Sequence, residues 1–209
     1  MIARLYAFMY DRIGRGSEAA GLQRERVALL AHARGNTVEI GAGTGLNLDH
    51  YPPTVTHLTL VEPDRHMRKR LRRRVAKQRP DAAVLDARAE SLPVQAASFD
   101  TVVVSFVLCS VDDQAAVLDE IARVLRPGGQ LLFIEHVRAD SPVLAWWQDR
   151  LLGPWRRFAC GCRCNRATVE LMRSCGFEVE ASKGAWPAMP PIVRPLMIGR
   201  AQPGGLVHD

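Results

Sequence analysis

The sequence predicts an α/β fold, in which a parallel sheet carries helices on both faces. Two observations lead to this class: short β-branched and apolar runs alternate with segments of helical periodicity, and a glycine-rich turn follows the first run. Apolar residues make up 47% and charged residues 24% of the 209 residues, which is ordinary for a globular protein. The length favours one domain with room for appended helices.

The expected elements follow one another in order along the chain. Five apolar runs are predicted strands: 37–41, 57–62, 82–87, 99–106 and 130–137. Helices are expected near 21–34, from about Thr44, over 65–79 and over about 112–126. The Pro127-Gly128-Gly129 stretch is a strong stop for the last of these helices.

The last third of the chain is expected to be helical first and extended afterwards. Residues 142–175 have a helical pattern with Asn165 as a candidate N-cap and Gly176 as a candidate C-cap, and 177–181 and 196–201 are predicted strands. Ligands of such sheets bind beyond the carboxyl ends of the strands. The residues that follow strands are therefore expected to meet at one edge: Gly41–Gly45, Glu62, Arg88–Glu90, Ser105–Cys109 and Glu135–His136.

The turn after the first strand places Gly41, Gly43 and Gly45 at alternate positions behind Glu39. Glycine tolerates positive φ and has no Cβ, which lets the backbone approach a ligand closely. In the dinucleotide fingerprint G-x-G-x-x-G the third glycine comes one residue later than Gly45, so this spacing argues against NAD as the ligand. Glu62 ends the second strand, where a carboxylate can accept hydrogen bonds from both ribose hydroxyls. The alternative for Glu62 is an ordinary surface acid.

Four segments together resemble the class I S-adenosylmethionine-dependent methyltransferases: VEIGAGTG, VEP, AESLPVQAASFD and VLRPGGQLLFIEHV. More narrowly, GAGTGLNLDHYPP, VLCSV, the GC…NR stretch and VRPLMIG are similar to the methyltransferase-like 7, or thiol methyltransferase, subfamily. The resemblance implies a single Rossmann-like domain, whose seven-stranded, mostly parallel sheet has an antiparallel last strand. Residues 37–209 would form the cofactor-binding domain, and residues 1–36 an N-terminal helical segment that serves as a lid or docks on it.

The same resemblance implies S-adenosyl-L-methionine as the cofactor. The residues expected to bind it lie in the glycine turn, at strand ends and in the adenine-side loop: Glu39, Gly41, Gly43, Gly45, Glu62, Pro63, Ala89, Glu90 and Ser105. Related quinone methyltransferases begin that loop with an acid, whereas this chain has Arg88. The adenine amino group is therefore expected to meet the backbone near Ala89 or the side chain of Glu90.

His136 and Glu135 follow the fifth strand, where the cleft is expected to open, and they are the candidate catalytic residues. His136 is the best candidate base, although a hydrogen-bonded histidine at a strand end is an equal alternative. A thiol has a pKa of roughly 8.5 and supplies some thiolate unaided, so that it needs little general base. An amine or a carbon nucleophile needs more help. Cys109 is expected beside the methionine end of the cofactor, or else in the core.

The resemblance therefore implies a methyltransferase that acts on a small, apolar molecule, and similarity to the thiol methyltransferase subfamily makes S-methylation of a thiol the leading hypothesis. The alternatives are N- or C-methylation of a lipid amine or quinone-like ring, and a non-catalytic S-adenosylmethionine-binding module. Aromatic residues of the late helical segment are expected in the substrate pocket or in the core: Trp146, Trp147, Trp155 and Phe158. An N-terminal group is expected to form a lid or a docking helix: Tyr6, Phe8, Met9 and Tyr10.

The cysteines do not predict a metal site. Cys160, Cys162 and Cys164 are crowded together, and Cys175 follows, but their spacing differs from the paired ligands of zinc sites. Cys162 matches a cysteine of the thiol methyltransferase subfamily and is better interpreted as a thiol that lines the pocket. The odd total of five cysteines also argues against a secreted disulfide framework.

Residues 65–79 form a strongly basic segment, with nine Arg or Lys and no acid, in a chain of formal net charge +6. Met67, Leu71 and Val75 recur every four residues and predict a buried stripe under a cationic face. No nucleic-acid partner is expected, because this helix lies away from the predicted substrate opening. Peripheral contact of residues 65–79 with an anionic membrane is the better interpretation of this charge. The chain lacks a run long enough for a membrane span and a recognisable signal peptide, so a cytoplasmic location is expected.

Overall fold

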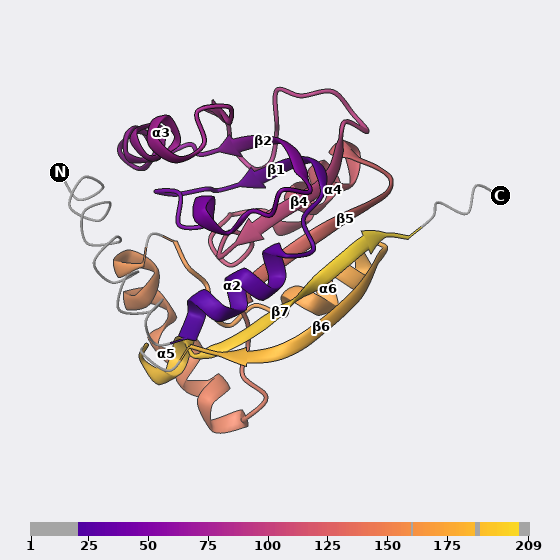
Figure 1. Cartoon of the computed structure of the whole chain (residues 1–209). Coiled ribbons are helices and arrows are strands. Elements are labelled where there is room, and N and C mark those ends of the chain that lie inside the picture. The colour runs from indigo at the N-terminus through magenta and orange to yellow at the C-terminus, as the bar shows by residue number, and fades with distance from the viewer. Residues whose placement is uncertain (1–20, 160, 187–188, 205–209) are drawn as a thin grey trace.

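Seven strands form one sheet in the order β3-β2-β1-β4-β5-β7-β6 (Figure 1). The computed structural model describes residues 21–159, 161–186 and 189–204. The strands are β1 Gly35–Ile40, β2 Val55–Val61, β3 Ala83–Leu85, β4 Phe99–Ser105, β5 Leu125–His136, β6 Phe177–Ala185 and β7 Pro195–Pro203. Neighbouring strands from β3 to β5 are parallel, whereas β7 runs antiparallel to β5 and β6. The predicted seven-stranded sheet with an antiparallel last strand is confirmed.

Helices cover both faces of this sheet, as predicted. The α-helices of the described residues are α2 Gln23–Leu30, α3 Arg65–Gln78, α4 Gln114–Val124, α5 Pro142–Phe158 and α6 Thr168–Ser174. Side chains of a strand alternate between faces, so that Val102 and Val104 pack with α4 while Val103 packs in the cluster that contains α2 and α3. Asp64 caps α3 by accepting from two backbone N–H groups of its first turn, at 2.8 Å each.

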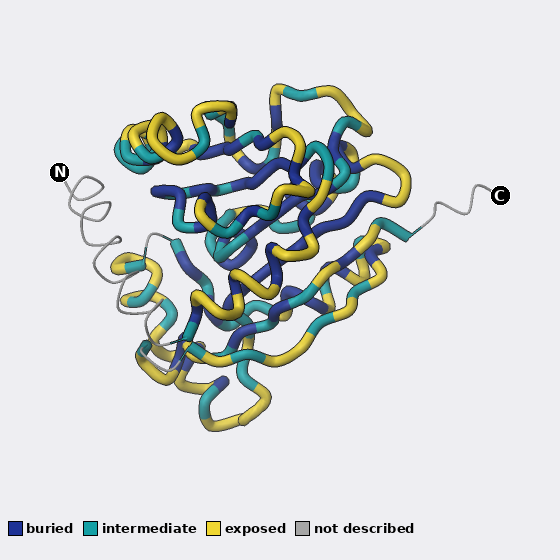
Figure 2. The backbone as a smooth tube through the Cα atoms, in the orientation of Figure 1, coloured by how far each residue is buried: buried dark blue, intermediate teal, exposed yellow. Residues whose placement is uncertain are grey.

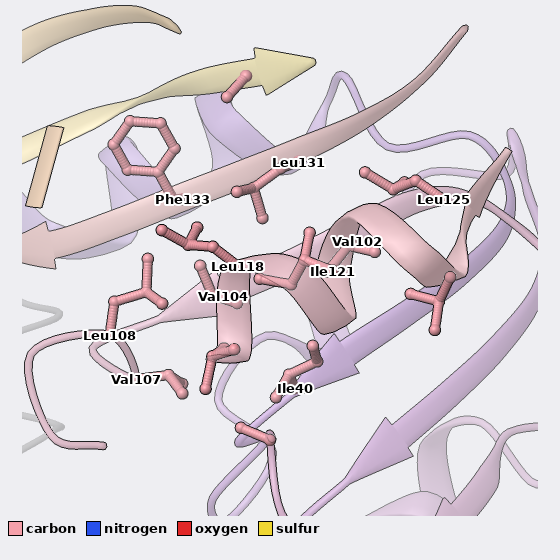
Figure 3. Close-up of a cluster of buried hydrophobic side chains, with 14 of the residues drawn as sticks. Ile40, Val102, Val104, Val107, Leu108, Leu118, Ile121, Leu125, Leu131 and Phe133 are labelled. Atoms are coloured by element: carbon pink, nitrogen blue, oxygen red, sulfur yellow. The ribbon is translucent and has the colours of Figure 1, made fainter. Parts of the chain in front are cut away.

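The core on the α4 side joins β4 and β5 to that helix. Figure 3 shows Val104, Leu131 and Phe133 of the two strands beside Leu118 and Ile121 of α4, and all five side chains are fully buried. Figure 2 shows the same trend along the backbone, because the central strands are mostly buried while the helices expose one side. The strand ends that form the site therefore project from a rigid, closely packed layer.

The predicted helix from Thr44 is wrong. The chain makes turns after β1 and then forms only a short 3-10 helix, η2 Leu48–His50. Three glycines with positive φ hold the turn, and the side chain of Asn47 is tied into a buried network described below. These constraints prevent the repeating backbone geometry that an α-helix requires.

Other boundaries differ in detail from the predicted ones. β5 begins at Leu125, ahead of the predicted glycine stop, and its register with β4 shifts there. The predicted helical stretch 142–175 is two helices. Asn165 does not cap α6, because its amide donates to Asp149 Oδ1 at 2.8 Å, whereas Gly176 follows the end of α6 with φ +83°. The predicted lid residues Tyr6, Phe8, Met9 and Tyr10 lie outside the described residues.

Candidate functional site

The glycine turn lies at the carboxyl end of β1, where Gly41, Gly43 and Gly45 have φ values of +68°, +58° and +87°. A Cβ on Gly45 would come within 2.7 Å of Leu48 and 2.8 Å of Leu71. Gly45 thus lets the turn pack closely on α3 and serves the fold more directly than a ligand. Gly41 lines the larger cavity of the site.

Glu62 connects the end of β2 to this turn. Its Oε2 accepts from the N–H of Gly43 and its Oε1 from the N–H of Asp64, each at 2.8 Å. Burial raises the pKa of Glu62, and the two backbone bonds act against that rise. Each carboxylate oxygen has two lone pairs, so both keep the capacity to accept a hydroxyl donor from the adjoining cavity.

Arg68 of the basic helix α3 holds the same strand end in place. Its guanidinium donates to the carbonyl oxygen of Glu62 at 2.6 Å and to that of Pro63 at 2.9 Å, and it also pairs with Asp86. The predicted buried stripe is confirmed in Leu71 and Val75. The periodicity of the sequence did not distinguish Arg68 from the exposed basic residues of α3, because its contact with the end of β2 depends on how α3 packs.

The larger cavity has a volume of about 340 Å³ and opens at the carboxyl ends of the parallel strands. The side chains and backbone around it come from four segments: Gly41, Glu62, Pro63, Arg88, Ala89, Glu90, Phe106, Val107, Ser110, Val111 and Asp112. Five of the nine predicted cofactor-binding residues are on this wall, and Gly43 is bonded to one of them. Glu39, Gly45 and Ser105 are not on it.

Glu39 instead belongs to a buried polar network beneath the turn. Its Oε1 accepts from Asn47 Nδ2 at 2.8 Å and its Oε2 from the Tyr51 hydroxyl at 2.7 Å. Asn47 Nδ2 also reaches Ser105 Oγ at 3.2 Å, and Arg26 Nη1 donates to Asn47 Oδ1 at 2.9 Å. Burial raises the pKa of Glu39 to about 7. The network fixes the turn against β1, β4 and α2, and no sequence pattern indicated the role of Asn47, Tyr51 or Arg26.

A second, apolar cavity of about 130 Å³ adjoins the first. Its walls are mainly aromatic rings and thiols: Phe106, Cys109, Ser110, His136, Trp155, Phe158, Ala159, Cys162, Trp186 and Met189. Phe106 and Ser110 line both cavities. Of the four aromatic residues expected in the substrate pocket or the core, Trp155 and Phe158 line this cavity, whereas Trp146 and Trp147 do not.

The Phe106 ring stands at the junction of the two cavities. Its backbone has φ +61°, an uncommon conformation for a bulky residue, which persists only where the surroundings enforce it. The ring packs against His136 and Trp186 with centroid separations of 4.7 and 5.1 Å. A guanidinium, that of Arg26, lies 5.6 Å from its centroid.

Glu135, the other candidate catalytic residue, holds the backbone that directly follows Phe106. The fully buried carboxylate accepts from the N–H groups of Val107 and Leu108 at 2.8 Å and of Cys109 at 3.0 Å. Burial raises the pKa of Glu135 to about 7, against the effect of these bonds. Glu135 therefore positions the turn that follows Phe106 and lines neither cavity.

His136 does line the apolar cavity, and its imidazole stacks on Trp186 at 5.5 Å. Burial lowers the pKa of His136 to about 4, and a hydrogen bond with the backbone of Val193 acts in the opposite direction. The ring is therefore neutral near pH 7. Its Nδ1 is buried and has no hydrogen-bond partner among the described residues, and the same holds for the indole N–H of Trp186. Unpaired polar atoms on an apolar wall suit a ligand with one polar group.

Two thiols meet on the same wall. Cys162 Sγ lies 3.8 Å from Cys109 Sγ, and both side chains are buried. The hydrogen bond with Cys162, together with burial, raises the pKa of Cys109. Within the part of the chain that the structure describes, no three potential ligands form a metal site. Cys164 is buried with its pKa raised to about 12, and the predicted Cys160 lies outside the described residues.

Comparisons with known proteins agree with this geometry. A family described as a methyltransferase domain matches residues 38–133. The thiol S-methyltransferase TMT1A of Homo sapiens is 32% identical over 169 residues, which span 78% of this chain and 69% of that protein. The phosphatidylethanolamine N-methyltransferase of Cereibacter sphaeroides is 33% identical over 146 residues, or 68% of each protein. A solved Thermotoga maritima methyltransferase, described as a possible histamine N-methyltransferase, shares the fold with a TM-score of 0.71 at 23% identity, covering 97% of this chain and 98% of that one.

Proposed function

Because the chain belongs to the S-adenosylmethionine-dependent methyltransferases, we propose that it transfers a methyl group to the sulfur of a small apolar thiol. The observation that carries this proposal is the apolar cavity beside the glycine turn, in which the histidine has a pKa of only about 4. Such a site can hold an apolar acceptor in place, and the described residues that line it offer no strong base. A thiol is the acceptor that needs none.

The residues around the larger cavity fit S-adenosylmethionine, which supplies a methyl group on a positively charged sulfur. Glu62 keeps lone pairs for two ribose hydroxyls in addition to its bonds to Gly43 and Asp64. Ala89 and Glu90 form the wall on the adenine side. Gly41, where a Cβ would come within 2.5 Å of the Val107 side chain, lines this cavity together with Phe106, and the methionine portion would lie beside them.

The apolar cavity would select, orient and desolvate the acceptor. Its volume of about 130 Å³ suits a small molecule, and its rings exclude water from the reacting atoms. The faces of Phe106 and Trp186 also favour a nearby cation such as a sulfonium. His136 Nδ1 can accept a hydrogen bond from the S–H group, although an imidazole of such low pKa does not retain the proton.

Methylation of a nitrogen is the second candidate function. The unpartnered Nδ1 of His136 is a neutral acceptor at pH 7, and it could orient the N–H of an amine already deprotonated in the apolar pocket. The similarity to a phosphatidylethanolamine N-methyltransferase points in the same direction. The narrow apolar cavity favours the thiol, because a neutral thiol enters it without the cost of desolvating an ammonium group.

A product-mass screen with isotopically labelled S-adenosylmethionine tests the proposal. Acceptors are offered in sets of matched size, for example benzenethiol, phenol and aniline, with short alkyl thiols and amines alongside. We expect labelled thioethers and an equal amount of S-adenosylhomocysteine. Detection of methylated amines or phenols without any thioether would contradict the thiol proposal. Such a result would support methylation of nitrogen, the second candidate function, or methylation of carbon or oxygen. Tight cofactor binding without turnover on any acceptor would indicate a binding module.

A further inference from the structure

Helix α5 presents an apolar face to solvent. Among the described residues, six large apolar side chains are exposed, and five of them lie on α5: Val143, Trp146, Trp147, Leu151 and Phe158. Their exposed fractions run from 38% for Leu151 to 69% for Val143. Single exposed apolar residues are ordinary, whereas five on one helix mark an interaction surface.

The opposite face of α5 is firmly held by the rest of the protein. Gln148 is fully buried and its amide donates to three carbonyl oxygens, those of Val137, Cys164 and Ile192, at 2.9–3.1 Å. Val143, Trp147 and Leu151 follow at intervals of four residues on the outer face. The helix therefore cannot turn its apolar side inward without breaking these buried bonds.

The charges along this face are positive. Arg150 and Arg157 lie seven residues apart on the same side as Val143 and Trp147. A hollow of about 260 Å³ at the end of the helix is lined by Gly153, Arg156, Arg157 and Gly161. Asp149, the only acid of α5, is engaged with Arg138 and Asn165. An apolar stripe with tryptophans and an arginine fringe matches the interface of an anionic bilayer.

The exposed face also continues into the apolar cavity. Phe158 is 62% exposed, yet it lines that cavity together with Trp155 one turn earlier. We propose that α5 docks the protein on an anionic phospholipid bilayer, with its apolar face inserted among the headgroups. The rim of the apolar cavity then lies at the membrane surface, where an apolar acceptor accumulates. The docking itself does not depend on the identity of that acceptor.

The basic helix α3 is a weaker candidate for the same role. Its apolar residues Leu71 and Val75 are buried, and its exposed face offers charge without a large, exposed apolar side chain to insert. Attraction through α3 alone would be electrostatic and would fade as salt screens it. Insertion of α5 adds apolar burial, which salt does not screen. Within the described residues, no helix is long and apolar enough to cross a membrane.

Flotation of the whole chain with lipid vesicles tests the docking. We expect binding to vesicles of phosphatidylcholine mixed with phosphatidylglycerol, with much of it retained at high salt. The triple variant Val143→Ser, Trp147→Ser, Leu151→Ser should bind at least about tenfold more weakly, because each side chain loses part of its apolar burial. The control Val27→Ser removes the other exposed apolar side chain, on α2, and should bind as the parent does.

A second variant tests the docking even if the triple variant does not fold. Arg150→Gln with Arg157→Gln alters only surface charge and should weaken binding to the anionic vesicles more than to phosphatidylcholine alone. Circular dichroism and thermal unfolding establish that each variant is folded. Equal binding of the parent and the triple variant would overturn the proposal. So would a parent that ignores vesicles but forms a dimer in sedimentation velocity, if the triple variant is a monomer, since the face would then join two copies.

Discussion

The two cavities of the site are neighbours, but they are built in different ways. The larger one is formed by strand ends and turns between residues 41 and 112, and its key contacts are backbone N–H groups and the carboxylate of Glu62. The smaller one is formed by aromatic rings and thiols that come largely from the chain after residue 135. Backbone geometry therefore determines the proposed cofactor side, whereas side-chain identity determines the proposed acceptor side. Mutations around the larger cavity should therefore change cofactor binding, whereas mutations around the apolar cavity should change the reaction with the acceptor.

The largest effect is expected from Gly43→Val. Gly43 has φ +58°, which a β-branched residue adopts poorly, and its N–H donates to Glu62. We expect no measurable binding of S-adenosylmethionine in calorimetry by the folded variant. Gly128→Val is the matched control, since Gly128 has φ +76° with open space around it at the opposite end of β5. Unchanged affinity in Gly43→Val would mean that the turn serves the fold alone.

Glu62→Ala should have the next largest effect, a loss of about 1.5–3 kcal/mol in cofactor binding, the range for hydrogen bonds to a charged group. That loss corresponds to roughly tenfold or more in Kd. The comparison to make is with a cofactor that lacks the 2′-hydroxyl. The deoxy compound should bind wild type more weakly but should bind Glu62→Ala about as well as the natural cofactor does. If wild type does not distinguish the two compounds, Glu62 does not contact the ribose.

His136→Asn tests the acceptor side through the pH dependence of the rate. Burial lowers the pKa of His136 to about 4, so the ring takes up its proton only as pH falls towards that value and causes no change near neutrality. For a thiol acceptor the rate should rise about tenfold per pH unit up to the pKa of the bound thiol, in both proteins. The variant should lose less than the roughly 10²–10⁴-fold of a true general base. A loss of that full factor, with the acidic limb removed, would contradict the thiolate mechanism.

The smallest effect is expected outside both cavities, on the exposed side of α3. Replacement of Lys69, Arg72 and Arg73 by Gln should leave turnover and cofactor affinity within about a few-fold, as is usual for surface charges. Arg68→Gln in the same helix should weaken cofactor binding more, because Arg68 holds the Glu62 and Pro63 carbonyls. Calorimetry on the two variants makes the comparison. A collapse of turnover in the triple variant alone would place the cationic face in the active site.

The same division explains what the sequence could predict. The cofactor side was largely predictable, since glycine spacing and an acid after a strand are local patterns that the parallel sheet brings to one edge. The acceptor side was not, because Phe106, Trp186 and Met189 meet only through the packing of distant segments. Glu39 was predicted at the cofactor, but it lies in the network below the turn, and nothing in the sequence marked Asn47 or Tyr51 as its partners.

The positions of Glu135 and His136 follow a rule of strand geometry that could have been applied to the sequence alone. Consecutive side chains of a strand point to opposite faces, so two neighbours on β5 cannot both enter one pocket. His136 faces the apolar cavity, and Glu135 turns to the backbone of residues 107–109. The predicted helix at Thr44 was wrong for a different reason, because the segment after the glycine turn was interpreted as a helix start, whereas the three glycines adopt positive φ and the chain makes turns there.

The position of Phe106 has a consequence for how this enzyme can diversify. Six of the described residues beyond His136 line the apolar cavity but not the larger one, so substitutions of them can change the proposed acceptor while the cofactor is retained: Trp155, Phe158, Ala159, Cys162, Trp186 and Met189. Phe106 is different, because one ring is a wall of both cavities. Exchanging it for Leu is expected to shift KM for the acceptor and Kd for the cofactor together, which measurements on a single variant can check. The shared Phe106 ring thus couples acceptor binding to cofactor binding, which could otherwise change independently. A related protein that evolves to use a new acceptor therefore has to accommodate it while keeping this ring.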